Sequence, residues 1–192
     1  MIAAGCYHGT ARSITLAELG DHPLQEGRGN HARWDRVVVP EVRQVAREDC
    51  GAAALAMVLG YWGRPGTRKE IAAASTPGPA PGIAAADLRD FARRQGLEAF
   101  VIEGRLDDLE REIRRRHPVV VGMMKRYGQR AYPHYEVVVG LDRSSPRVLT
   151  LDPASGLRVN SREGFVAEWA AARQLALVIF PPSSRASAAG GP

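Results

Sequence analysis

One cysteine in this sequence stands where a nucleophile would be expected. Cys50 follows the polar run 47–49 and precedes the small-residue run 51–54, which predicts a helix that starts at the thiol. At a helix N-terminus, the helix dipole and the unpaired backbone N–H groups favour the thiolate. The side-chain amide of Gln44, shortly upstream, could donate a hydrogen bond to an oxyanion. These are two parts of a cysteine acyl-transfer site, and the third part, a histidine, must come from elsewhere in the chain.

Two later segments supply a histidine and a carboxylate. Residues 133–142 are rich in β-branched side chains and predict a strand with His134 at its opening. Residues 147–156 predict the next strand, which ends at Asp152 and a turn of Pro, Ser and Gly, and residues 142–146 form a plausible hairpin loop. Antiparallel pairing would make His134 and Asp152 neighbours, so that the carboxylate could orient the imidazole.

Four short elements, in this order, resemble the peptidase C39 family, the papain-like bacteriocin-processing cysteine peptidases: Gln44, Asp49-Cys50-Gly51, His134-Tyr135 and Asp152-Pro153. The resemblance covers about residues 37–180. It implies that Cys50 is the nucleophile and His134 the general base. It also implies that Asp152 orients the imidazole and that Gln44 is an oxyanion-hole donor. The implied substrate is a peptide or protein, cleaved in a leader peptide after a Gly-Gly type motif.

In the best-known members of that family, the peptidase domain is fused to an export transporter. This sequence has no apolar run near the roughly 18 residues that a membrane-spanning helix needs, and no Walker-type phosphate loop. A separate export transporter is therefore a candidate partner. The chemistry requires no metal and no organic cofactor. Two alternatives stay open: an acyltransferase that uses the same triad, and a peptide-binding module that does not catalyse a reaction.

Composition sets further bounds. A chain of 192 residues can bury a sizeable core in one domain. The net charge is +5, and the basic residues are spread along the chain. The Arg114–Arg116 triple is typical of a solvated helix end. We therefore expect no nucleic-acid partner. Two cysteines do not make a disulfide framework. Cys6 follows small residues as in a lipoprotein signal, so two localisations stay open: an exported protein or lipoprotein, and otherwise a cytoplasmic one. Membrane association is expected only if Cys6 is lipidated.

The remaining pattern predicts the elements that must position these residues. We expect an N-terminal arm over 1–36 with a short helix at 13–19, the peptidase-like domain over 37–180, and a disordered tail over 181–192. Within the domain, the expected helices are 50–62, 67–74, 83–95, 106–116 and 162–173, and the expected strands besides the two above are 97–102, 118–124 and 175–180. Residues 126–133 read as a flexible loop at the rim of the cleft, where Tyr127 and Tyr132 could contact substrate.

In the first of these helices, Ala54, Met57, Val58 and Tyr61 recur at helical spacing and should form one core-facing stripe. Helices come mostly before strands along the chain. This order predicts an α+β protein with a papain-like fold, in which a helical lobe that begins with the nucleophile helix packs on an antiparallel β-sheet.

Overall fold

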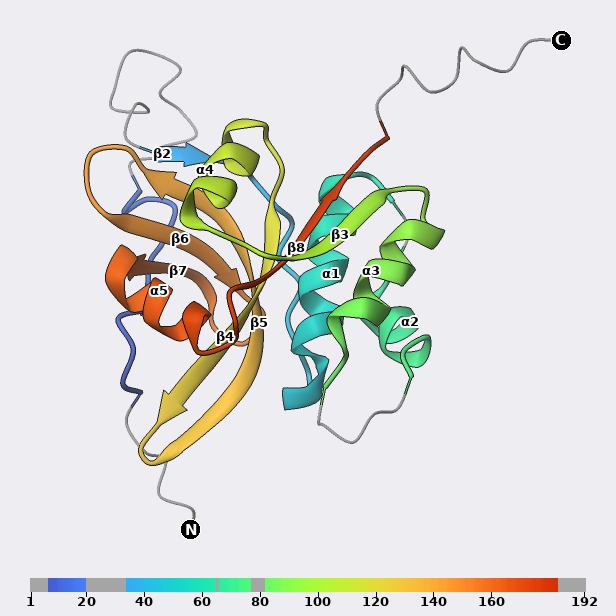
Figure 1. The fold of residues 1–192 in the computed structure, drawn as a ribbon, viewed down its shortest axis with the longest axis horizontal. Coiled ribbons are helices and arrows are strands. Elements are labelled where there is room, and N and C mark those ends of the chain that lie inside the picture. The colour runs from blue at the N-terminus through green and yellow to red at the C-terminus, as the bar shows by residue number, and fades with distance from the viewer. Residues whose placement is uncertain (1–6, 20–33, 65, 77–81, 183–192) are drawn as a thin grey trace, which may run out of the picture.

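The computed structural model describes residues 7–19, 34–64, 66–76 and 82–182 (Figure 1). These residues form a helical layer and an antiparallel sheet, which confirms the predicted α+β class. Cys6 and the tail beyond residue 182 lie outside the described residues. Within these ranges, none of the helices has both the length and the apolar character needed to cross a membrane.

Helix α1 (Cys50–Tyr61) occupies the centre of the helical layer. It contacts strands of the sheet on one side and the helices α2 (Arg68–Ala73) and α3 (Ala85–Arg94) on the other. Every residue from Cys50 to Leu59 is buried. The prediction of a single core-facing stripe was therefore too narrow: the run of alanine and glycine gives a thin helix that neighbours can enclose on all sides.

The strands of the sheet are β1 (Arg12–Ser13), β2 (Trp34–Arg36), β3 (Glu98–Glu103), β4 (Val119–Tyr127), β5 (Arg130–Asp142), β6 (Arg147–Asp152), β7 (Gly156–Ser161) and β8 (Leu175–Phe180). They pair antiparallel in the order β1-β7-β6-β5-β4-β8-β3, and β2 pairs with the C-terminal end of β5. The predicted strand at 175–180 has the predicted bounds, whereas β7 was not anticipated.

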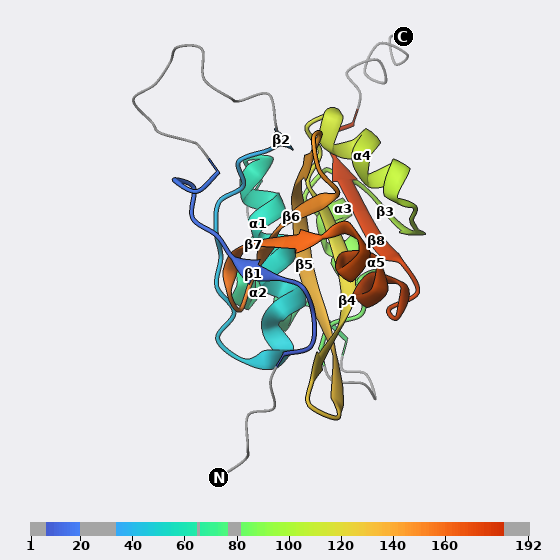
Figure 2. The same cartoon turned by 90° about the vertical axis from the view of Figure 1, so that its left-hand side faces the viewer.

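Two further helices cover the sheet. Helix α4 (Leu106–Arg114) contacts β5, β2 and β4, and α5 (Arg162–Ala170) contacts β4, β7 and β6. Figure 2 shows strands β4 and β5 between α1 on one side and α5 on the other. As predicted, α5 directs Phe165 and Trp169 inward, and both side chains are fully buried. The sheet is thus held between two apolar layers, which fixes the strands that carry His134 and Asp152.

The prediction of a flexible loop at 126–133 is wrong. Strands β4 and β5 continue as a paired hairpin to Tyr127 opposite Arg130, with the turn at Gly128 and Gln129. Gly128 has a φ of 57°, a left-handed conformation that glycine adopts without strain. The rings of Tyr127 and Tyr132 lie 6.4 Å apart on this hairpin, a cross-strand contact that favours continued pairing.

The described parts of the predicted N-terminal arm lie on the sheet. Strand β1 pairs with β7, and β2 pairs with β5. Tyr7 forms an isolated bridge with Tyr127, and the backbone N–H of His8 donates to the Arg126 carbonyl at 3.1 Å. The prediction of a short helix at 13–19 is wrong. Arg12 and Ser13 form a strand, and residues 16–19 form a turn. The division of the chain at residue 37 stays a prediction.

Candidate active site

Cys50 is the first residue of α1, as predicted, and the polar run before it forms one 3-10 turn, η1 (Arg47–Asp49). The Cys50 side chain is 5% exposed. The residue that follows it has to be small: a Cβ at position 51 would lie 3.1 Å from the Tyr135 ring and 3.3 Å from the Leu88 side chain. Gly51 thus lets the strand that carries His134 pack closely against the start of α1.

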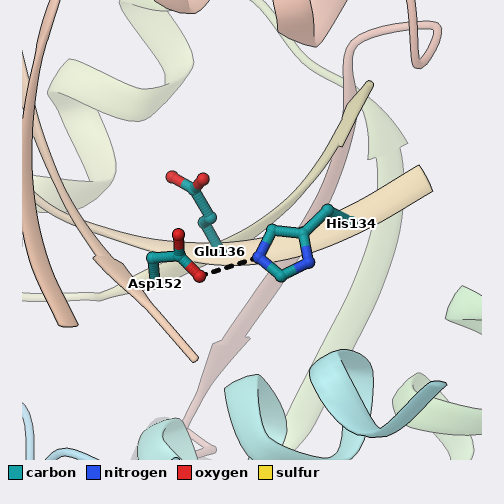
Figure 3. Close-up of side chains that lie close together, drawn as sticks. All are labelled: His134, Glu136 and Asp152. Carbon is teal, nitrogen blue, oxygen red and sulfur yellow. Dashed lines mark hydrogen bonds and ion pairs between the residues drawn. The ribbon is translucent and has the colours of Figure 1, made fainter. Parts of the chain in front are cut away.

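His134 and Asp152 are neighbours, which confirms the predicted adjacency. Strands β5 and β6 run antiparallel with Val137 opposite Leu151, so the beginning of one strand meets the end of the other. The ring nitrogen Nε2 of His134 lies 2.8 Å from Asp152 Oδ1 (Figure 3). The same oxygen accepts the Ala154 backbone N–H at 2.8 Å, so the turn after β6 holds the carboxylate in place.

The charge state of His134 follows from these contacts. Burial by itself lowers the pKa of an imidazole. At His134 this effect is outweighed by hydrogen bonds with Asp152 and the Cys50 thiol and by attraction to the Asp152 and Glu136 carboxylates, which together raise its pKa to about 10. Burial raises the pKa of Asp152, but the hydrogen bond and the charge of His134 more than offset this, so the carboxyl pKa is lowered. The imidazolium form, which stabilises a neighbouring thiolate, is therefore favoured.

A cleft of about 700 Å³ gives access to the cysteine and the histidine. One wall comes from the helical layer and includes Arg47, Glu48 and Ile83. The facing wall comes from the hairpin and from residues 171–173, which follow α5. The Arg47 guanidinium lies 4.2 Å from the centre of the Tyr132 ring, so the two walls are in contact beside the thiol. Tyr132, which the sequence placed at the rim, does line the cleft.

The backbone of Gln44, and not its side chain, bonds to the turn beside the site. Its backbone N–H donates to the Pro153 carbonyl at 3.1 Å, which ties the segment before α1 to the turn that carries Asp152. Its side-chain Oε1 is buried and has no hydrogen-bond partner among the described residues. The structure thus brings Cys50, His134 and Asp152 together and places Gln44 next to that group, while its role as an oxyanion donor stays a prediction.

Sequence reasoning missed two charged residues beside the site. Glu136 is fully buried, and its Oε1 lies 2.6 Å from the Lys125 ammonium. A His134 ring nitrogen, a Glu136 oxygen and an Asp152 oxygen all lie within 4.8 Å of one another. Here the ammonium already supplies a positive charge to the cluster. The available signal was a glutamate directly before three consecutive valines, residues 137–139.

The double role of Asp152 Oδ1 leads to a prediction. An asparagine at 152 can still accept from His134 and from the Ala154 N–H, but it lacks the negative charge. We expect Asp152→Asn to retain rapid iodoacetamide alkylation of Cys50 near pH 7, and Asp152→Ala to slow it about tenfold or more because the ring loses its orienting partner. Peptide mapping of the Cys50 adduct over time measures both rates. Equal rates in the two variants would contradict an orienting role for Asp152.

Comparison with known proteins agrees with this geometry. A thiol that opens a buried helix, opposite a histidine–aspartate pair on an antiparallel sheet, defines a papain-like cysteine-type peptidase. The family model described as "Peptidase C39 family" matches residues 39–184, and the chain belongs to that family.

Three individual relatives are similar to the same region. The lactococcin-A transport/processing ATP-binding protein of Lactococcus lactis subsp. lactis is 30% identical over 134 residues, which is 66% of this chain but only 17% of that protein. The double glycine motif protease of an AMS/PCAT transporter, solved with a leader peptide, aligns with a TM-score of 0.61 at 25% identity over 76% of this chain and 94% of that one. The peptidase domain of Streptococcus ComA, a bifunctional ABC transporter, aligns at 0.58 and 25% identity over 79% and 99%.

Proposed function

We propose that this chain hydrolyses a peptide bond, with Cys50 as the nucleophile and His134 as the general base and acid. The observation that carries the proposal is the shared cleft: Cys50 and His134 line one cavity, and Asp152 bonds to the far side of the imidazole at 2.8 Å. A nucleophile, a base within reach of it and an orienting group behind the base make up the arrangement that acyl transfer requires.

The proposed reaction runs in two stages. The Cys50 thiolate attacks the substrate carbonyl, and the resulting oxyanion accepts hydrogen bonds from the Cys50 backbone N–H and the Gln44 amide. The His134 imidazolium then protonates the leaving amine as the C–N bond breaks, which leaves a thioester on Cys50. In the second stage His134 takes a proton from water and the hydroxide attacks the thioester. The C–S bond then breaks, the carboxylic acid product leaves, and the Cys50 thiolate and the His134 imidazolium are restored.

We further propose that the substrate is a leader peptide cleaved after a Gly-Gly type motif, in support of bacteriocin-type peptide processing. One solved relative is described as a double glycine motif protease in complex with a leader peptide. Apolar side chains on both walls of the cleft, among them Ile83, Met124 and Leu175, offer a surface for the apolar side chains of a peptide. Two relatives are described as transporters or parts of them, so an export transporter is the partner we propose.

A peptide series tests this function. We expect cleavage after Gly-Gly, and we expect replacement of both glycines by valine to lower kcat/KM by about 100-fold or more, because added methyl groups must fit beside the thiol. Mass spectrometry of the products, with and without an added primary amine, separates hydrolysis from acyl transfer. Binding of the Gly-Gly peptides without cleavage, by a protein whose Cys50 is intact, would instead favour a peptide-binding module.

A further inference from the structure

A buried chain of charged and polar side chains leads away from the active site. The Lys125 ammonium lies 2.6 Å from Glu136 Oε1 and 2.7 Å from Glu168 Oε2, and these three residues are 5%, 0% and 8% exposed. The Tyr7 hydroxyl donates to the other oxygen of Glu168 at 2.6 Å. We refer to Tyr7, Glu168, Lys125 and Glu136 as the buried network.

Packing alone does not explain why these charged residues are buried. Buried ion pairs are costly to desolvate, and apolar side chains of similar volume often serve stability equally well. The strands around it are apolar: β5 continues with Val137, Val138 and Val139, all buried. A charged pair kept in such surroundings is better explained by what it does to a neighbouring group than by its own stability.

That neighbour is the imidazole. Glu136 lies two positions after His134 on β5, so the two side chains point to the same face of the strand. Figure 3 shows the Glu136 and Asp152 carboxylates near each other, with Asp152 bonded to the ring. A Glu136 oxygen lies within 4.8 Å of a His134 ring nitrogen and of an Asp152 oxygen.

The Lys125 ammonium balances this group. Two carboxylates close together repel each other, and an ammonium 2.6 Å from one of them offsets that repulsion. The charged and titratable groups around His134 are Asp152 from β6, Cys50 from α1, Glu136 from β5, Lys125 from β4, Glu168 from α5, Arg47 and Glu48 from η1, and the cleft residues Tyr132, Tyr135 and Arg173.

We propose that Glu136 and Lys125 are positioning residues for His134: the carboxylate holds the ring in its protonated form, and the ammonium, anchored by Glu168 and Tyr7, holds that carboxylate in place and balances its charge. This inference rests on the proposed function, because it assigns a role toward the proposed base. It also extends the active site to Tyr7, which lies outside the residues 39–184 that match the family.

The experiment is the pH dependence of Cys50 alkylation by iodoacetamide, read on the Cys50 peptide because Cys6 also carries a thiol. In the wild type we expect, besides the change in rate that titration of the thiol causes, a second change at alkaline pH, where His134 loses its proton. In Glu136→Gln we expect that second change to move to lower pH by about one unit, because a carboxylate a few ångströms from the ring is lost. In His134→Ala it should be absent.

Matched variants separate this role from a structural one. Glu168→Gln removes a buried carboxylate on the other side of Lys125 and should shift the alkaline change less than Glu136→Gln does. Glu103→Gln removes an exposed carboxylate on β3 and should not shift it. Glu136→Met fills a similar volume with no buried amide and gives the same test if the glutamine variant does not fold.

The outcomes are distinguishable. An alkaline change that stays at the wild-type pH in Glu136→Gln and in Glu136→Met would overturn the inference and leave the proposed function standing. A wild-type profile identical to that of His134→Ala would overturn the proposed function, and the inference with it. A shift in Glu136→Gln that exceeds the shift in Glu168→Gln supports both.

Discussion

Replacing His134 with alanine should lower kcat/KM for peptide cleavage by about 10⁴-fold or more. In the proposed mechanism the imidazole both stabilises the Cys50 thiolate and protonates the leaving amine, so its removal would take away two contributions at once. Because nucleophile and base act as one unit, Cys50→Ala should lose about as much activity, and the double variant should lose little more than either single variant. Steady-state cleavage of a Gly-Gly peptide measures all three.

The control for this experiment is another histidine of the chain. His8 is exposed, and its backbone N–H, not its side chain, bonds to Arg126. His8→Ala should therefore cleave at the wild-type rate. Substantial cleavage by His134→Ala, with the same product, would contradict the assignment of His134 as the base.

Replacing Trp169 with alanine should lower the free energy of unfolding by about 3–5 kcal/mol. The side chain is fully buried on α5 and packs against Phe165, with the ring centroids 5.6 Å apart. Its indole N–H donates to the Leu175 carbonyl at 2.9 Å, which links α5 to the start of β8. The backbone of Gly104 also lies against it, since a Cβ there would meet the indole at 3.1 Å. Urea denaturation followed by circular dichroism measures the loss.

Two variants bracket this effect. Trp169→Phe keeps most of the apolar volume and loses the hydrogen bond, so we expect a loss of about 1–2 kcal/mol. Phe100→Ala removes a ring that is 44% exposed on the edge strand β3 and should cost less than Trp169→Ala. If Trp169→Ala unfolded at the same urea concentration as Phe100→Ala, α5 would not be the part of the core that the structure indicates.

The parts of the site that could be predicted from the sequence rest on local signals. A polar turn followed by small residues placed Cys50 at the start of a helix, and two β-branched runs joined by a short loop placed His134 beside Asp152. Each of these depends on residues close in sequence and on the fixed pleat of paired strands. The structure confirms both.

What could not be predicted depends on distant contacts. The buried network joins Tyr7 to Glu168, 161 positions apart, and its existence depends on where α5 lies on the sheet. Strands β1 and β2 have two and three residues and show no pattern of their own, because pairing with β7 and β5 creates them. The enclosure of α1 on all sides likewise depends on its neighbours and not on its own periodicity.

The measurement that tests the central claim most directly is the capture of an acyl-enzyme. A Gly-Gly peptide mixed with the protein and quenched in acid after a fraction of a turnover should leave the peptide segment before the scissile bond attached to Cys50 as a thioester, detected by peptide mapping. The same adduct should be missing from Cys50→Ser and His134→Ala. Continued cleavage by Cys50→Ala, with no adduct on the wild-type thiol, would contradict a cysteine mechanism at this site.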